Sequence, residues 1–301
     1  MAILNNEEKE RLEVIKADFD VLIFGNGANG VTMQEAITSI KAVLERTIIE
    51  LGEDGKTALI RSQKPIKLIH EVVKTALINY GINPNNIYPN LGSSNGELKL
   101  AGFLKKKDQD ICIKPNNINP NNEILTAGLL AGQDDIYGLL MTEQLLSINV
   151  RSQLSSLGNN IDTLYERTFA EALNLHMRCP RMCLGEVYLI PVYEYDKHEA
   201  QRNNIAFVRA MSKVETYIMA FNALNSRVNI ADDNYKYERV CLLIVDFNRE
   251  IPKIYNTDAE LKADGLLGVN SISSISNLNF NNFVSDLFNA YTSRFPDNTF
   301  N

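Results

Sequence analysis

The run of residues 239–247 constrains the fold more than any other part of the chain. It reads RVCLLIVDF, and a nearly all-apolar run of this length is typical of a strand that is buried on both faces. A second strand-like run covers residues 184–195, and residues 199–225 between the two have the apolar spacing of an amphipathic helix. The order strand, helix, strand predicts an α/β protein with a mixed central sheet that is flanked by helices.

The other expected elements follow from the same periodicities. Helices are expected at residues 7–16, 31–51, 66–80 and 283–291, short strands at 21–24 and 57–60, and a hairpin with strands 98–104 and 111–114. Residues 123–174 have a helical pattern that glycines interrupt. We therefore expect one domain over residues 1–301, with an N-terminal helical region (1–65), a helical insertion (about 116–180) and a C-terminal extension (about 250–301).

The composition excludes some classes of protein. The chain has 301 residues, of which 45% are hydrophobic and 22% charged, so it can bury a core. No apolar run approaches the ~20 residues that cross a bilayer, and the N-terminus lacks the features of a secretory signal, so we expect a cytoplasmic protein with no membrane partner. The net charge of −7 disfavours non-specific coating of nucleic acid, although a local cleft can still be basic.

Four cysteines are too few for a disulfide framework, so we expect reduced thiols. His176, Cys179 and Cys183 have a spacing that a zinc ion could use, with His198 or Asp196 as a further ligand. The neighbouring residues are apolar, and buried cysteines without a metal are the more common outcome of such a pattern.

The glycines Gly25, Gly27 and Gly30 form a G-x-G-x-x-G pattern between an expected strand and an expected helix, which is the context of a dinucleotide-binding loop. The next expected strand ends in Arg61 and Ser62, which would suit the 2′-phosphate of NADP rather than a ribose hydroxyl. The chain does not continue with the alternation of a Rossmann domain, so the pattern is also consistent with an ordinary turn. An NADP-dependent oxidoreductase is therefore one alternative function.

Two carboxylates stand at the ends of expected strands. Asp110 precedes the second hairpin strand, and Glu186 lies near the start of the strand 184–195. Mg²⁺ prefers oxygen ligands in rigid geometry, and a bound Mg²⁺ activates water and stabilises a phosphoryl transition state. Acidic residues at strand ends are more often simply solvated, so this pattern alone indicates a metal site only weakly.

The order of elements and several local segments add a resemblance. Helix, three strands, helix, strand resembles the core of the PD-(D/E)xK nucleases, in which a hairpin and the following strand present the Asp and the (D/E)xK pair. The local segments that resemble stand-alone bacterial restriction endonucleases are GELKLAG (96–102), KDQD (107–110), SINVRSQLSS (147–156), DTLYERTFAEALNLH (162–176) and LGEVYLIPVYEYD (184–196). The resemblance covers about residues 90–200.

The resemblance implies metal-binding roles for Asp110 and Glu186, with Mg²⁺ as the cofactor. Glu166 and Glu171 lie five apart on an expected helix and point to different faces, so at most one can join the site, and we take Glu166 as the further candidate ligand.

The lysine of the (D/E)xK pair has no counterpart in this alignment, because Tyr188 stands where the resemblance expects it. Lys114 could supply the positive charge from another strand. Alternatively, Glu97 and Lys99 form the pair themselves, because they have the same spacing.

DNA contacts need basic or polar side chains on a shared surface. The candidates in the expected insertion are Arg151, Gln153, Arg178 and Arg181, because arginine binds guanine edges and phosphates with two hydrogen bonds. Arg202, Arg209 and Lys213 would form a polar stripe on the expected helix 199–225. Such a stripe is more often a solvated face.

Together these features predict a Mg²⁺-dependent Type II restriction endonuclease that cleaves double-stranded DNA. A near-palindromic site would favour a homodimer. The NADP-dependent oxidoreductase and a non-catalytic DNA-binding module are the alternatives.

Overall fold

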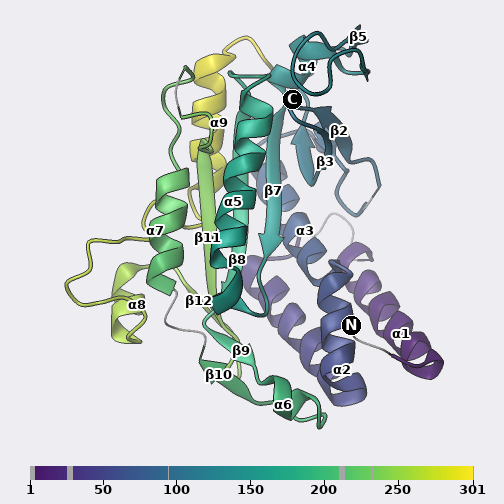
Figure 1. The fold of residues 1–301 in the computed structure, drawn as a ribbon, viewed down its shortest axis with the longest axis vertical. Helices are drawn as coiled ribbons and strands as arrows, with labels where there is room; N and C mark the ends of the chain where they lie inside the picture. Colours follow the sequence, from purple (N-terminus) through teal and green to yellow (C-terminus); the bar gives the residue numbers. More distant parts are fainter. Residues whose placement is uncertain (1–3, 26–29, 94, 210–213, 232, 301) are drawn as a thin grey trace.

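A computed structural model of the chain describes residues 4–25, 30–93, 95–209, 214–231 and 233–300. Its centre is a six-stranded mixed sheet with helices on both faces, and three helices form an N-terminal region beside it (Figure 1). The expected α/β class with a mixed central sheet is therefore confirmed.

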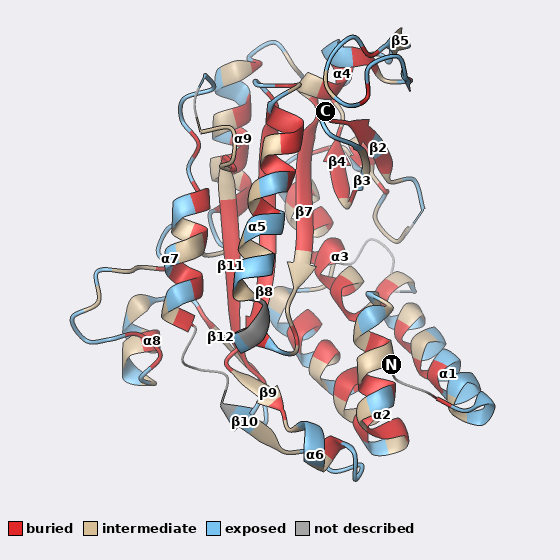
Figure 2. Ribbon diagram, viewed as in Figure 1, coloured by how far each residue is buried: buried red, intermediate tan, exposed pale blue. Residues whose placement is uncertain are grey.

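The sheet has the strand order β1-β4-β7-β8-β11-β12. These strands are β1 (Ile87–Tyr88), β4 (Ile111–Ile113), β7 (Leu146–Ser152), β8 (Cys183–Pro191), β11 (Arg239–Asp246) and β12 (Lys253–Tyr255). β7, β8 and β11 are parallel, whereas β4 runs antiparallel to β1 and β7, and β12 runs antiparallel to β11. All of β8 is buried, as expected of a central strand with helices on both faces (Figure 2).

Two helical layers cover the sheet because strand side chains point alternately to its two faces. On one face Tyr188 and Leu242 pack with α5 (Leu157–His176), α7 (Val214–Leu224) and the short helix α8 (Asp258–Ala263). On the other face Val187 and Leu243 pack with α9 (Phe283–Arg294) and the N-terminal helices. The expected strand 239–247 and the final helix are thus present, with small differences at their ends. The expected strand 184–195 is divided, because β8 ends at Pro191 and residues 193–195 form a strand of a separate sheet.

The N-terminal helices are α1 (Asn6–Phe24), α2 (Met33–Arg61) and α3 (Lys64–Asn79). Capping boxes begin the first two, in which the Asn5 and Thr32 side chains accept backbone N–H groups three residues on. The expected strands 21–24 and 57–60 are wrong, because they are helical segments of α1 and α2. Their apolar residues Ile23 and Leu59 belong to buried helix faces rather than to strands.

The expected hairpin is present with a different second strand. β2 (Leu98–Ala101) pairs with β3 (Lys106–Gln109) outside the main sheet, so the turn lies at residues 102–105. The segment expected as the second hairpin strand is β4, a member of the main sheet. A 3-10 turn, η2 (Pro84–Asn86), precedes β1.

The expected helical insertion is wrong at its centre, because the sheet strand β7 lies within it. The remainder holds the strand pair β5 (Glu123–Ile124) and β6 (Asp134–Asp135), the short helix α4 (Gly138–Gln144) and α5. The apolar side chains of Ile148 and Val150 alternate with the polar ones of Asn149 and Arg151, which is the period of a strand rather than of a helix.

The expected helix 199–225 is wrong over its first half. This segment contains the end of α6 (Lys197–Ala200), the strand β10 (Phe207–Arg209), which pairs with β9 (Tyr193–Tyr195), and only then α7. No helix among the described residues is long and apolar enough to cross a membrane.

Candidate functional site

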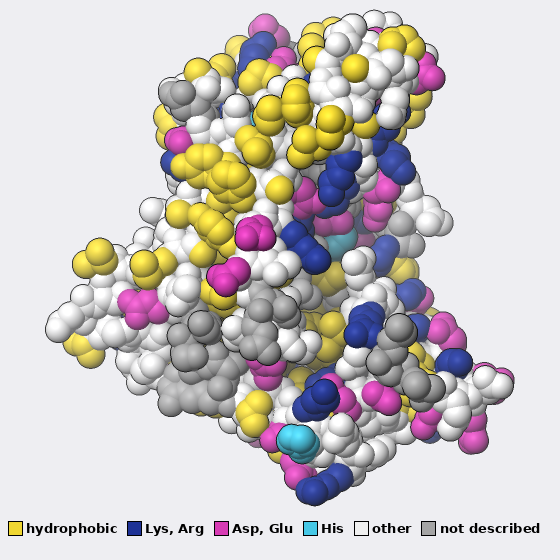
Figure 3. Space-filling model, in the orientation of Figure 1, with side chains coloured by type: hydrophobic (Ala, Val, Ile, Leu, Met, Phe, Trp, Pro, Cys, Tyr) yellow, Lys and Arg dark blue, Asp and Glu magenta, His cyan; other side chains and the backbone are white. Residues whose placement is uncertain are grey.

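A cleft of about 740 Å³ opens between the N-terminal helices, the β2–β3 hairpin, the C-terminal end of β7 and α5. Figure 3 shows Lys and Arg side chains around a hollow in this part of the surface, with Asp and Glu side chains among them. The charged lining residues are Arg61, Lys67, Lys105, Lys107, Arg151 and Arg167, and Glu97, Asp110 and Glu171. Six cations against three carboxylates make the cleft locally basic on a chain of net charge −7.

Neighbouring sheet strands bring Asp110, Asn149 and Glu186 into one row behind the cleft. Asn149 of β7 pairs directly with Glu186 of β8. Asp110 immediately precedes Ile111, which pairs with Ile148, so it stands beside Asn149 on the other edge of β7. The Asp110 Oδ2 atom accepts a hydrogen bond from the Val150 N–H at 2.8 Å, which fixes the carboxylate against β7.

Glu186 is fully buried, and no donor among the described residues meets its carboxylate oxygens in good hydrogen-bonding geometry. The Asn149 amide and the Tyr237 hydroxyl nevertheless lie close enough to favour the ionised form and lower its pKa slightly. Its nearest cation is Arg151, whose Nε lies 3.5 Å from Oε1. Burial raises the pKa of Glu186 to about 7, while Arg151 opposes the shift and Asp110 adds to it. A buried carboxylate without a well-placed hydrogen-bond donor is costly, so the ionised Glu186 side chain destabilises the fold.

Three more buried polar atoms without hydrogen bonds among the described residues lie around this row. They are Asn149 Oδ1, the Tyr188 hydroxyl and His70 Nε2, and both Tyr188 and His70 line the cleft. Burial lowers the pKa of His70 to about 4, although Asp110 opposes the shift. Unsatisfied buried groups are rare in folded proteins, and a concentration of them beside one cleft is typical of a site that binds a ligand.

Glu171 of α5 lies between two cations from different elements. Its Oε1 contacts Lys107 Nζ of β3, and its Oε2 contacts Arg151 Nη2 of β7. The Glu171 side chain retains 10% of its exposure and those of Lys107 and Arg151 retain 31% and 21%, so all three reach the cleft. Two cations from different strands thus converge on one carboxylate at the wall of the cleft.

Asn174, one turn beyond Glu171, fastens the hairpin to α5. Its Oδ1 accepts the N–H groups of Leu104 at 2.7 Å and Lys105 at 3.1 Å, and its carbonyl oxygen accepts that of Phe103 at 2.8 Å. A β-carbon at Gly102 would lie 2.3 Å from Asn174 Nδ2, so this turn requires glycine. The contact places the lysines of the hairpin at the cleft.

Some of the expected site residues line the cleft, and the others lie outside it. Asp110, Glu97, Arg151 and Gln153 line the cleft, and Glu186 lies just behind it. Burial raises the pKa of Glu97, and Lys67 opposes that shift.

The remaining expected catalytic residues do not line the cleft. Lys99 is exposed beside Asp108 at 3.8 Å, and Lys114 follows β4 at the end opposite to Asp110. Glu166 is exposed on α5, so of the two glutamates considered as site members, Glu171 is the one in the cleft. The expected assignment of Glu166 as a metal ligand is therefore not supported by the geometry.

The basic residues expected to bind DNA are mostly used within the fold. Arg178 pairs with Glu123 and Asp135 at 2.9 and 2.6 Å. Arg181 lies over the Phe295 ring at 4.6 Å, away from the cleft.

The expected stripe on helix 199–225 does not form. Arg202 follows α6 and pairs with Glu199 at 2.9 Å, and Arg209 ends β10. Lys213 lies outside the described residues. The cleft residues that the sequence did not indicate are Lys67, His70, Lys105, Lys107 and Arg167, together with Asn149 in the row behind them. Arg61, which also lines the cleft, was indicated only as a contact to the 2′-phosphate of NADP.

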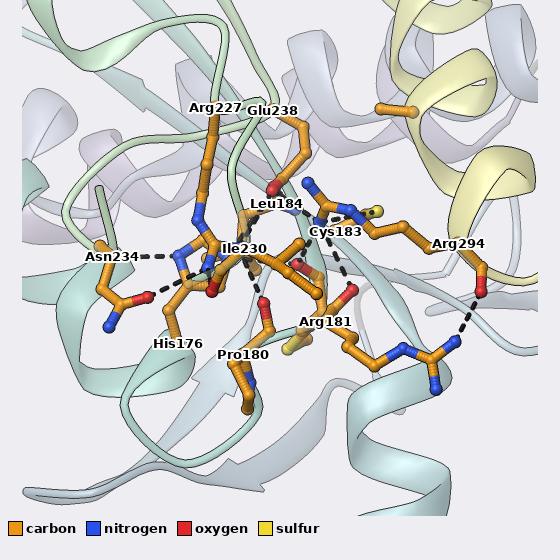
Figure 4. Close-up of polar contacts among 12 residues, drawn as sticks. His176, Pro180, Arg181, Cys183, Leu184, Arg227, Ile230, Asn234, Glu238 and Arg294 are labelled. Atoms are coloured by element: carbon orange, nitrogen blue, oxygen red, sulfur yellow. Dashed lines mark hydrogen bonds and ion pairs between the residues drawn. The ribbon is translucent and has the colours of Figure 1, made fainter. Parts of the chain in front are cut away.

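A second polar cluster, at the opposite end of β8, is an internal ion network (Figure 4). The Glu238 carboxylate there lies 3.2 Å from Arg227 Nη1 and 2.7 Å from Arg294 Nη1 and accepts the Leu184 N–H at 2.6 Å. The ring nitrogens of His176 face the backbone oxygens of Asn234 and Met182 at 3.0 and 3.1 Å. Each member thus has a partner within the network, which ties α5, β8, β11 and α9 together.

The two other expected sites have little support in the structure. The cysteines at positions 112, 179, 183 and 241 are free and buried, and His176 uses both nitrogens within the ion network, so a zinc site there is not supported. Gly25 follows the helix α1, not a strand, so the glycine pattern lacks the context of a dinucleotide-binding loop. Residues 26–29 of that pattern lie outside the described residues.

The oxygen donors of the row behind the cleft are of the kind that could hold a magnesium ion together with several waters. Nowhere in the described part of the chain do three or more His, Cys, Asp or Glu side chains gather as a metal site. Mg²⁺, however, is commonly held by one or two carboxylates together with water and substrate phosphate. Asp110, the unpartnered oxygens of Glu186 and the Asn149 Oδ1 atom are oxygen donors of that kind.

Comparison of the chain with protein-family models, with curated proteins and with solved structures finds no match.

Proposed function

We propose that the protein is a metal-dependent endonuclease that hydrolyses phosphodiester bonds of double-stranded DNA. The observation that carries the proposal is the row Asp110, Asn149 and Glu186, with its unsatisfied oxygens, at the wall of a basic cleft. Carboxylates that bind a hard cation, placed beside Arg and Lys side chains that bind phosphate, are the components that such a reaction needs.

The order and direction of the sheet elements support the same function. α3 is followed by the sheet strands β1, β4 and β7, then by α5 and by β8, which is parallel to β7. This order resembles the helix, three strands, helix, strand of the PD-(D/E)xK nucleases. In this alignment β7, rather than β8, is the third strand, and Asn149 and Arg151 occupy the positions of the acid and the lysine.

The acid missing from β7 has a replacement on the next strand. Asn149 pairs with Glu186, so the Glu186 carboxylate lies one strand away from the position that the resemblance assigns to an acid. Asp110 and Glu186 would hold Mg²⁺, which when bound lowers the pKa of a water molecule and stabilises charge on the phosphate. Arg151 and Lys107 of the chain itself would bind and orient the phosphate.

The test is incubation of the purified protein with phage DNA in buffer with Mg²⁺ and in buffer with EDTA. We expect discrete fragments with Mg²⁺ and intact DNA with EDTA. DNA that stays intact over a wide range of Mg²⁺ and salt concentrations would contradict the proposal.

The second candidate is a DNA-binding protein that does not cleave. It is favoured by Arg151, because arginine remains protonated in proteins and cannot accept a proton from water as a neutral lysine can. DNA binding that is as tight with EDTA as with Mg²⁺, with no fragments in either, would favour this candidate.

A further inference from the structure

Glu171 has the charge and shape of the group that the cleft is built to bind. A carboxylate and a phosphodiester each carry one negative charge and present two acceptor oxygens to surrounding donors. In Glu171 one oxygen meets Lys107 and the other meets Arg151, and these cations come from two different strands rather than from α5 itself. We propose that Glu171 occupies the position of a backbone phosphate of duplex DNA and must leave when DNA binds.

The exchange is compatible with the burial of the groups involved. Arg151 also faces Glu186 at 3.5 Å, and Glu186 is fully buried and held within β8. Arg151 therefore keeps the Glu186 carboxyl group beside it when Glu171 moves away. Glu171 stands on the wall of the cleft, with Arg167 and Asn174 on the same face of α5, so its side chain can turn into open space.

Glu171 would consequently act as an electrostatic gate. It neutralises Lys107 and Arg151 when no DNA is present, and it repels any anion that does not bring enough further contacts to displace it. The cleft provides such contacts for a long polyanion through Arg61, Lys67, Lys105 and Arg167. A single phosphate ion can reach only part of this set, so the gate favours duplex DNA over free phosphate.

The inference rests on the proposed function, and Glu171→Gln tests it. The amide keeps the shape and removes the charge, so we expect the variant to bind a fluorescent 20-base-pair duplex at least about tenfold more tightly in EDTA, because like-charge contacts at an interface are costly. Glu166→Gln is the matched control, since Glu166 is exposed on the same helix outside the cleft. Screening at 0.15 M salt should limit the change in DNA affinity of Glu166→Gln to about twofold.

Lys107→Ala is made in the wild type and in Glu171→Gln. The comparison shows whether the gain in DNA affinity arises at the contact between Glu171 and Lys107. We expect the change to weaken DNA binding more in Glu171→Gln than in the wild type, because Glu171 neutralises Lys107 in the wild type. Inorganic phosphate should compete with the duplex for Glu171→Gln at lower concentrations than for the wild type. Thermal unfolding of each variant confirms that it is folded.

Three results would overturn the inference while leaving the proposed function in place. They are equal affinities of Glu171→Gln and Glu166→Gln, weaker DNA binding by Glu171→Gln than by the wild type, and an effect of Lys107→Ala that is the same in both backgrounds. Failure of the wild type and of Glu171→Gln to bind DNA would instead contradict both the proposed function and the inference.

Discussion

Glu186→Gln tests how much the buried carboxylate at the centre of the sheet lowers the free energy of unfolding. Burial raises the pKa of Glu186 from its ordinary value of 4.5 to about 7, even with Arg151 beside it. One pKa unit corresponds to about 1.4 kcal/mol, so the ionised side chain destabilises the folded chain by about 3 kcal/mol. Glutamine has nearly the same shape and does not ionise, so the variant avoids this cost.

The pH dependence follows from proton binding in the two states. Well below pH 4.5 the carboxyl group is protonated in both the folded and the unfolded chain, and it has no effect on the pH dependence. Between pH 4.5 and about 7 the folded chain still binds a proton that the unfolded chain has released, so the stability falls as the pH rises. Above that window the loss is complete.

Urea denaturation of the wild type and of Glu186→Gln at pH 4.5 and pH 8 is the assay. We expect the stability of the variant, relative to the wild type, to rise by about 3 kcal/mol between the two pH values. Glu166→Gln, an exposed change, should show a difference within about 0.5 kcal/mol at both. A stability difference between Glu186→Gln and the wild type that is the same at both pH values would refute the argument from burial.

Adding Mg²⁺ in the same experiment tests the proposed metal site independently of the pH dependence. At a hundredfold excess over its dissociation constant, Mg²⁺ should stabilise the wild type at pH 8 by about 2.7 kcal/mol. Glu186→Gln should gain much less, because it lacks one of the proposed carboxylate ligands. If Mg²⁺ stabilised neither protein, the metal proposal would be wrong while the pH dependence could still hold.

The remaining predictions concern cleavage, the hairpin and association. Asp110→Asn should reduce DNA cleavage by about a hundredfold or more and leave DNA binding intact, and comparison with Glu97→Gln in the same digest shows which carboxylate the reaction needs. Gly102→Ala should lower the free energy of unfolding by about 1–3 kcal/mol in urea denaturation, because the added methyl group displaces Asn174. Leu140 is 63% exposed on α4 among other exposed apolar residues, so we expect a dimer in sedimentation at micromolar concentration and a monomer for Leu140→Asp.

The sequence predicted the elements whose pattern is local and unambiguous. The run that forms β11 and the apolar spacing of α3 each indicate their structure without knowledge of any neighbour. Residues 21–24 were harder, because a short apolar run is compatible with both a strand and a buried helix face, and here the helix α1 continues through it. Glycines around α4 similarly concealed β7 within an apparent helical segment.

Sequence reasoning named Asp110, Glu186 and Arg151 as candidate site residues but did not predict the strand arrangement that brings them together. The contact of Glu186 with Asn149 depends on the register of β8 against β7, and β7 was not recognised as a strand. Arg178 has the same residue type as Arg151 and was expected in the same insertion, yet it pairs with acidic residues of β5 and β6. Residue type indicates which chemistry is possible, whereas only the tertiary structure shows which cations remain available to a ligand.

If the proposed function holds, the sheet also explains how Tyr188 can stand at the position where the resemblance expects a lysine. When Glu186 is aligned with the acid of a (D/E)xK pair, Tyr188 occupies the lysine position and the pair is incomplete. In the sheet, however, Tyr188 pairs with Arg151, just as Glu186 pairs with Asn149. Read across the two strands, Glu186 and Arg151 restore one carboxylate and one cation at neighbouring positions, 3.5 Å apart. Under the proposed function, the acid and the cation of the pair would thus be divided between β8 and β7, so a search for both on one strand would not find them.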